Sequence, residues 1–247
     1  MKDRKNKLWE GLASEAQALR ATRDYNAGSL PERLRGNGVE AGELITADKT
    51  DSAITGAWIP GVEVLARKIH PQRFRGVFGE FARRDEGVLA QIGFWPVQWA
   101  SARMFANTAK GFHVHPPVIP EGKEPSEWLR HLFVGAPGNY SARPYDREQW
   151  DVIFFVQGVV EMILRDTRAG LDSRIMRFVI DGDNHRSGNN VGVVVPAGVA
   201  HAVRAEGTED VIMVYGTSTS FRPEFEGRIA SEIETAQLPE SWQKFLA

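Results

Sequence analysis

The sequence predicts a mainly β fold, a sandwich or barrel of short strands that follows a helical arm. From about residue 60, β-type runs alternate with Gly, Pro and Asp turn residues, a texture typical of such folds. Several runs also alternate apolar and polar positions. In Val159–Asp166, for example, Val160, Met162 and Leu164 share one face and Glu161 lies on the other.

The predicted strands share this composition and lie between turn signals. They are Val62–Lys68, Val77–Ala82, Val88–Phe94, Val97–Phe105, Asp151–Val156, Val159–Asp166, Arg174–Ile180, Val191–Val195, Val199–Ala205 and Val211–Thr217. In Arg174–Ile180 the apolar side chains oppose Arg174 and Arg177, which indicates one buried and one polar face.

The ends of the chain have a different pattern. The first 25 residues carry apolar side chains at helical spacing, and residues 36–56 form a polar, aperiodic connecting arm. We therefore divide the chain into an arm, 1–56, and a β domain, 57–247. The tail predicts a short C-terminal helix around Ser241–Leu246.

Residues 116–147 interrupt the strand pattern. They hold six prolines and a helix candidate, Ser126–Phe133. Long structured loops of this kind are often lids or substrate walls, so we expect an insertion that borders a site.

Composition excludes several classes of protein. With 30 Lys and Arg against 32 Asp and Glu, the net charge is −2, which argues against a nucleic-acid partner. The absence of cysteine excludes disulfides and thiolate metal centres. No run is long and apolar enough to span a membrane, and Met1–Glu10 lacks the apolar core of a secretory signal. We expect a soluble, cytoplasmic protein without a membrane partner.

Two histidine motifs carry the candidate chemistry. In Lys110-Gly111-Phe112-His113-Val114-His115, the two histidines are two residues apart and project to the same face of a strand. In Pro196-Ala197-Gly198-Val199-Ala200-His201, the Pro and Gly predict a tight turn that places His201 near the start of the next strand.

Together these motifs resemble those of the cupin superfamily, a double-sheet β-barrel or jelly roll. In metal-binding cupins they supply the ligands, which here would be His113, His115, Glu121 and His201. Three imidazoles and a carboxylate suit divalent iron, manganese, nickel or zinc. The prolines around Glu121 depart from the continuous strand that this motif usually forms.

A longer stretch, from Ile59 to Ile229, resembles the dTDP-4-dehydrorhamnose 3,5-epimerase family of nucleotide-sugar epimerases, which are metal-free cupins. The matching motifs follow one another in the same order along both chains. They are Arg75-Gly76-Val77-Phe78-Gly79-Glu80, then Gln98, Lys110-Gly111-Phe112-His113, Pro196-Ala197-Gly198-Val199-Ala200-His201, Tyr215, and Glu226-Gly227.

This resemblance implies an isomerase that epimerises a nucleotide-linked 4-keto-6-deoxy sugar without a cofactor. By position, His113 would be the catalytic base and Tyr215 the acid. The substrate-binding residues would be Arg75, Glu80, Gln98, Lys110 and His201. The family also implies a homodimer in which strands near the start of the barrel pair across subunits, with the leading arm covering a sheet edge.

At two positions this chain has a different charged residue from the one found in the family. Lys110 stands where the family has Arg, and Asp151 stands where it has the Lys that holds the keto oxygen. Lys110 or His201 are candidates to replace that cation. Two alternatives stay open: a metal-dependent oxygenase or isomerase that uses the His-x-His motif, and a non-catalytic small-molecule-binding cupin, which the lost Lys favours.

Overall fold

A computed structural model describes most of the β domain. The described residues are 39–46, 58–106, 108–115, 117–118, 122, 133–134, 148–172, 174–185, 187–222 and 227–229. The predicted N-terminal and C-terminal helices and nearly all of the 116–147 insertion lie outside them. Among the described helices, none is long and apolar enough to cross a membrane.

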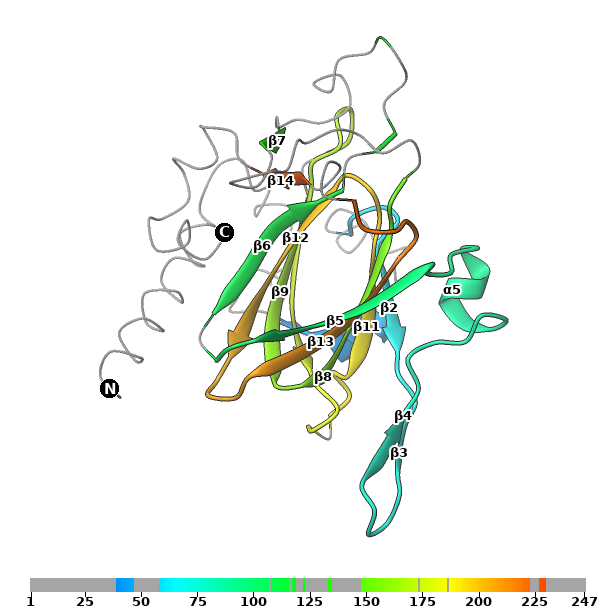
Figure 1. The fold of residues 1–247 in the computed structure, drawn as a ribbon, viewed down its shortest axis with the longest axis vertical. Coiled ribbons are helices and arrows are strands. Elements are labelled where there is room, and N and C mark those ends of the chain that lie inside the picture. Colours follow the sequence, from blue (N-terminus) through cyan, green and yellow to red (C-terminus); the bar gives the residue numbers. More distant parts are fainter. Residues whose placement is uncertain are drawn as a thin grey trace, which may run out of the picture.

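Two sheets face each other and enclose a barrel, which confirms the predicted double-sheet architecture (Figure 1). The seven-stranded sheet has the order β1-β10-β9-β12-β6-β14-β7. Its strands, in chain order, are β1 Val39–Glu40, β6 Ala109–Val114, β7 Phe133–Val134, β9 Val159–Asp166, β10 Ile175–Asp181, β12 Val199–Glu206 and β14 Gly227–Ile229.

The second barrel sheet has five strands in the order β2-β11-β8-β13-β5. They are β2 Glu63–Ala66, β5 Gln98–Met104, β8 Asp151–Gln157, β11 Val191–Val195 and β13 Val211–Thr217. A separate hairpin pairs β3 Ile69–Pro71 with β4 Val77–Gly79. The described helices are α3 Ala41–Thr46 and α5 Gly87–Gln91.

The main core lies between the two barrel sheets. Met162, Leu164 and Phe178 from the seven-stranded sheet pack in one cluster with Phe155 and Val193 from the five-stranded sheet. These side chains are fully buried, and they alternate along their strands as the sequence predicts.

The polar face of the seven-stranded sheet is buried as well, which the alternation alone did not indicate. Glu161, Arg177 and Arg204 are each less than 5% exposed. Glu161 forms ion pairs with both arginines, and its Cα partner on β12 is Arg204. Buried charges are tolerated in proteins when they are paired in this way.

The predicted strand Val88–Phe94 is instead a short helix followed by a turn. α5 occupies Gly87–Gln91 and buries Leu89 against Phe154 and Val152 on the outer face of the five-stranded sheet. A short apolar run has the same composition in either structure, and tertiary packing decides between them. Gly87 and Gly93, both with φ near +70° to +77°, bound the single helical turn.

The connecting arm contributes structure to the barrel. β1 adds to β10 in parallel, so the arm covers this sheet edge, as predicted. α3 follows directly and buries Ala41 and Leu44 in the main core. Residues 39–46 therefore form a strand and a helix. This corrects the prediction that 36–56 is an aperiodic connecting arm.

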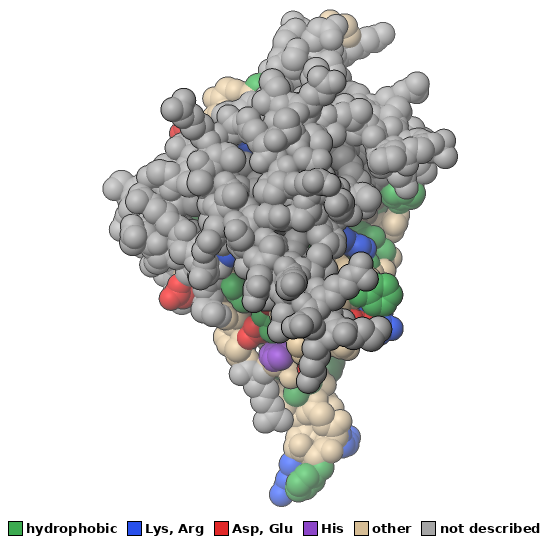
Figure 2. Space-filling model, turned by 90° about the vertical axis from the view of Figure 1, so that its left-hand side faces the viewer, with side chains coloured by type: hydrophobic (Ala, Val, Ile, Leu, Met, Phe, Trp, Pro, Cys, Tyr) green, Lys and Arg blue, Asp and Glu red, His purple; other side chains and the backbone are tan. Residues whose placement is uncertain are grey.

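The β3–β4 hairpin projects away from the barrel (Figures 1 and 2). Phe74 at its tip is 92% exposed and Phe78 is about half exposed. Arg73 and Arg75 flank Phe74, and both are exposed. A tip that exposes an aromatic side chain between two arginines is typical of an interaction surface.

Candidate active site

A pocket of about 540 Å³ opens inside the barrel, between the two sheets. Lys110, His113 and His201 line it from the seven-stranded sheet, and Asp151 and Tyr215 line it from the five-stranded sheet. Its volume lies in the range of pockets that hold small organic ligands.

The two histidine motifs meet at this pocket. The backbone N–H of Gly198 donates to the carbonyl of His115 at 2.7 Å, which fixes the Pro196–Gly198 turn against the end of β6. Gly198 has φ +75°, a conformation that a side chain would strain. From this turn β12 pairs with β6, and His201 lies opposite His113.

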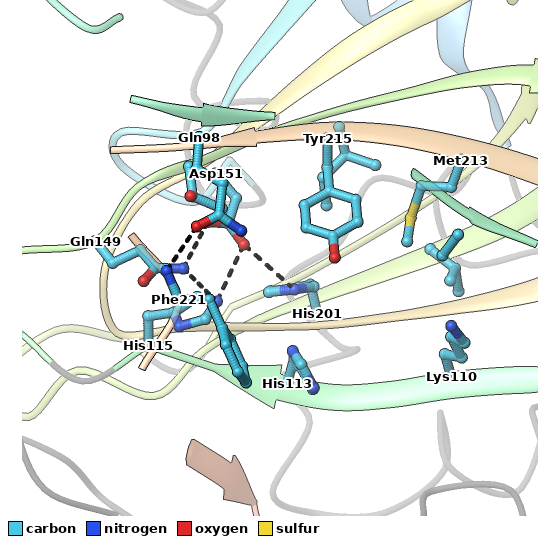
Figure 3. A pocket seen from close by; sticks show the side chains of 14 residues that line it. Gln98, Lys110, His113, His115, Gln149, Asp151, His201, Met213, Tyr215 and Phe221 are labelled. Carbon is cyan, nitrogen blue, oxygen red and sulfur yellow. Dashed lines mark hydrogen bonds and ion pairs between the residues drawn. The ribbon is translucent and has the colours of Figure 1, made fainter. Parts of the chain in front are cut away.

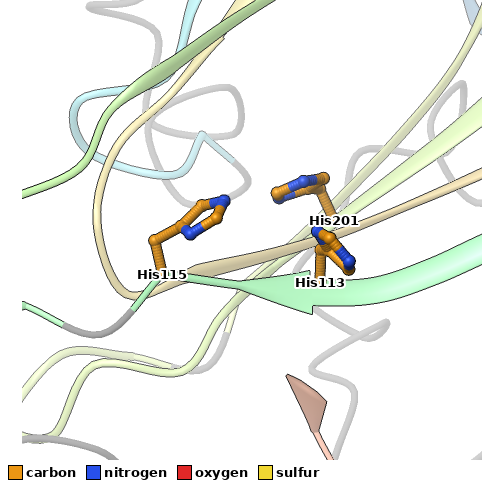
Figure 4. A group of neighbouring side chains, drawn as sticks. All are labelled: His113, His115 and His201. Carbon is orange, nitrogen blue, oxygen red and sulfur yellow. The ribbon is translucent and has the colours of Figure 1, made fainter. Parts of the chain in front are cut away.

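The three imidazoles form a nearly equilateral group (Figure 4). The ring centroids of His113, His115 and His201 are 5.8 to 6.0 Å apart. One nitrogen of each ring lies within 4.8 Å of the others, the spacing of a potential metal site among the described residues. His115 and His201 are buried and His113 is half-buried.

A β-bulge brings Lys110 to the same pocket as His113. The pairing of β12 with β6 shifts by one residue between His201, opposite His113, and Val203, opposite Lys110. In a regular strand, residues three apart would face opposite ways, and a bulge re-aims one of them. Lys110 thereby becomes a pocket cation.

Asp151 lies at the centre of a buried hydrogen-bonded cluster (Figure 3). Its Oδ2 is 3.0 Å from His115 Nε2 and 3.9 Å from His201 Nε2. Gln149 Nε2 donates to Asp151 Oδ1 at 3.1 Å. Gln149 itself is held by the hydroxyl of Thr219, which donates to Gln149 Oε1.

This environment keeps Asp151 ionised. Burial by itself raises the pKa of its carboxyl, but the charges of His115 and His201 outweigh that effect, helped by hydrogen bonds from His115 and Gln149. Together they lower the pKa to about 2. The site therefore contains a buried carboxylate that requires a positive neighbour.

His113 and Tyr215 approach the pocket from opposite walls. His113 is on β6 and Tyr215 is on β13, and Figure 3 shows both side chains directed into the space between the sheets. Tyr215 pairs with Ile153 and Ala100 in the five-stranded sheet, so its register is set by neighbours on both sides.

The pocket includes five of the seven residues to which the sequence assigned catalytic or substrate-binding roles: His113, Tyr215, Gln98, Lys110 and His201. It does not include the other two, Arg75 and Glu80. Arg75 lies at the hairpin tip, and Glu80 pairs with Arg83 outside the barrel, because the chain turns outward after β2. Glu121, the predicted carboxylate ligand, lies outside the described residues.

The family resemblance put Asp151 in the site, at the position of the family's Lys, and the pocket includes it. The sequence analysis did not assign Gln149 or Phe221 to the pocket. For Gln149 and Phe221, which lie in loops, the sequence held no periodicity that could have placed them.

Fold and site together define a double-sheet barrel with a histidine-rich interior pocket, and solved structures share this fold. One is a dTDP sugar isomerase from Desulfovibrio desulfuricans, 13% identical, with a TM-score of 0.52 over 74% of this chain and 92% of that one. Another is ChmJ, a 3'-monoepimerase from Streptomyces bikiniensis in complex with dTDP-quinovose, 19% identical, with a TM-score of 0.50 over 76% and 77%.

The resemblance to nucleotide-sugar epimerases is thus confirmed at the level of the fold. No family model matches the sequence, and no curated protein matches it. The roles of the pocket residues have to be argued from their geometry.

Proposed function

We propose that the protein is an isomerase that epimerises a nucleotide-linked 4-keto-6-deoxy sugar by proton transfer. The observation that carries the proposal is the placement of His113 and Tyr215 on opposite walls of one pocket. Epimerisation removes a proton from one face of a carbon and returns one to the other face, so it needs a base and an acid on opposite sides.

His113 is suited to the role of base. Its imidazole is half-buried and lines the pocket, so it can reach a bound ligand, and imidazole is the side chain that most often serves as a general base. Protons on carbons next to a ketone are acidic because the resulting anion is delocalised onto the oxygen. Tyr215, across the pocket, would return a proton to the opposite face.

The remaining pocket residues fit the rest of such a substrate. Lys110 offers a charge-assisted donor for a diphosphate, and Gln98 offers an amide for sugar hydroxyls. Proton transfer between these groups needs no cofactor. The substrates named for the two structural relatives, dTDP sugars, are consistent with this assignment.

The test is proton exchange followed by NMR. The full chain is incubated in heavy water with a dTDP-4-keto-6-deoxyglucose mixture, and deuterium at C3 and C5 is measured. We expect the wild type to incorporate deuterium and His113→Ala to lose it, because loss of a positioned base costs about 100- to 10,000-fold in rate.

Tyr215→Phe is the matched variant, since it removes one hydroxyl and leaves the ring. It should retain deuterium exchange while forming less epimer. A wild type that exchanges at neither carbon would overturn the proposal and favour a binding protein. Equal exchange by wild type and His113→Ala would overturn the role of His113.

We also propose that the protein forms a homodimer through the β3–β4 hairpin. The exposed aromatic tip and β5, the edge strand of the five-stranded sheet among the described residues, are two surfaces that a second copy would cover. Such a contact would also bring Arg75 to another subunit, where it could meet a substrate. Sedimentation at micromolar concentration should show a dimer for wild type and a monomer for Phe74→Ser with Phe78→Ser; a monomeric wild type would contradict the proposal.

A further inference from the structure

We propose that the sugar bound in the interior pocket carries an amino group, and that Asp151 binds this group as an ammonium ion. The inference rests on the proposed function and makes it more specific, because the substrate would be a nucleotide-linked amino sugar. It is carried by the positions of the charged side chains in the pocket and by the hydrogen bonds of Asp151.

The charged side chains of the pocket lie at its two ends. Lys110 is the one Lys or Arg among the described lining residues, and Asp151 is the one Asp or Glu. Figure 3 shows the two side chains at opposite ends of the pocket, Lys110 on the seven-stranded sheet and Asp151 on the five-stranded sheet. A ligand with a diphosphate at one end and an ammonium group at the other has the complementary arrangement of charge.

The Asp151 carboxylate has capacity for one more hydrogen bond. Its Oδ1 accepts from Gln149 at 3.1 Å, and its Oδ2 lies 3.0 Å from His115 Nε2. His201 Nε2 is 3.9 Å from the same oxygen, which is too long for a hydrogen bond. Because each carboxylate oxygen accepts up to two hydrogen bonds, Oδ2 can accept one from a ligand while the protein keeps its own contacts.

The chemistry of a carboxylate favours an ammonium group over the other groups of a sugar. An ionised carboxylate only accepts hydrogen bonds, so it repels a keto oxygen and requires a donor. A hydroxyl group donates one hydrogen bond without charge, whereas an ammonium group donates up to three and carries the opposite charge. The Asp151 side chain is 6% exposed, and at such a buried position a charge-assisted hydrogen bond is stronger than a neutral one.

The proposed reaction indicates where on the sugar the amino group lies. The diphosphate is attached at C1, the ketone is at C4 and C5 carries the methyl group, so C3 is the remaining carbon remote from the diphosphate. Asp151 and Tyr215 line the same wall, because Tyr215 pairs with Ile153, two residues along β8 from Asp151. Such diagonal neighbours are roughly 7–8 Å apart, so a ring that contacts Tyr215 can present the substituent of a neighbouring carbon to Asp151.

The experiment compares two stable ligands that differ only at C3. Calorimetry measures the binding of dTDP-3-amino-3,6-dideoxyglucose, and of dTDP-6-deoxyglucose with its hydroxyl at C3, to the full-length protein at pH 7. Amines beside electron-withdrawing groups titrate at about pH 8, as α-amino groups do, so the amino ligand is charged under these conditions. We expect it to bind about 10-fold tighter or more, the range of a hydrogen bond between charged groups.

Three variants locate this preference. Asp151→Asn keeps the shape of the side chain but removes its charge, so it should bind the two ligands equally. Lys110→Met should weaken both ligands by a similar factor and keep the preference, because the two ligands share the diphosphate. Asp172→Asn is the matched control: its side chain is 71% exposed and lies outside the described pocket lining, so this variant should bind both ligands as the wild type does.

Equal affinity of the wild type for the two ligands would overturn the inference, and the imidazoles of His115 and His201 would then balance the charge of Asp151. This comparison does not depend on the folding of any variant. A preference for the amino ligand that persists in Asp151→Asn would overturn the role of Asp151.

The outcome is separable from that of the proton-exchange test. The keto sugar of that test lacks the amino group, so it is used at saturating concentration. A wild type that prefers the amino ligand but exchanges no sugar proton would contradict the proposed function and leave the amino-group site standing. Proton exchange together with equal affinity for the two ligands would do the reverse.

Discussion

Replacing Arg67 with Met should destabilise the fold far more than the same change at an exposed arginine. The Arg67 side chain is fully buried, and its guanidinium lies 4.7 Å from the centre of the Phe81 ring. It forms an ion pair with Asp183 and donates to Asn190 Oδ1 at 2.9 Å and to the Glu80 carbonyl at 3.0 Å.

The expected cost follows from these contacts. Met preserves most of the packing volume but leaves Asp183, Asn190 and the carbonyl of Glu80 without their donor. Removing one partner of a buried ion pair costs about 3–5 kcal/mol. Because the Asp183 side chain is 20% exposed and water can reach it, we expect the lower end, about 3 kcal/mol. For a protein of this size that lowers the melting temperature by roughly 6–12 °C.

Arg103→Met is the matched control. Arg103 also pairs with an aspartate, Asp210, but its side chain is 66% exposed. Exposed ion pairs contribute about 0–1 kcal/mol, so this variant should unfold close to wild type. The assay is urea unfolding of both variants beside wild type. Equal free energies of unfolding for Arg67→Met and Arg103→Met would refute the reasoning from burial.

Two further changes test the backbone of the barrel. Gly158 and Gly170 both have positive φ, +76° and +80°, but a Cβ at Gly158 would lie 2.9 Å from the carbonyl oxygen of Asp210, whereas Gly170 has open space. Gly170→Ala should therefore lower the free energy of unfolding by about 1–2 kcal/mol through backbone strain alone. Gly158→Ala should lower it clearly more. Equal losses of stability in thermal unfolding would contradict this. Gly192→Ala would place its Cβ 2.7 Å from Cδ1 of the buried Phe154 ring. The free energy of unfolding should therefore fall by about 1–3 kcal/mol through overpacking. Unchanged stability would show that the ring moves freely.

Local patterns in the sequence were sufficient to predict most of the barrel. Short β-type runs between turn residues placed the strands from β8 to β13, and period-two alternation supported β9 and β10 among them. It failed at α5, because one turn of helix and a short strand share the same composition. It also missed the burial of Glu161 and Arg177, since a strand pattern does not reveal what packs on its outer face.

By itself the sequence determined that His113 and His115 project to one face and that His201 follows a tight turn, because spacing within a strand and a Pro-Gly turn are local properties. That the two motifs meet in one site was implied only by the resemblance to the cupins. Only the tertiary structure decided what surrounds them. Asp151 meets His115 because β8 lies in the opposite sheet, and Lys110 joins the pocket through a bulge in the pairing of β6 with β12. Register between strands far apart in the chain is set by packing of the whole barrel, which no local pattern encodes.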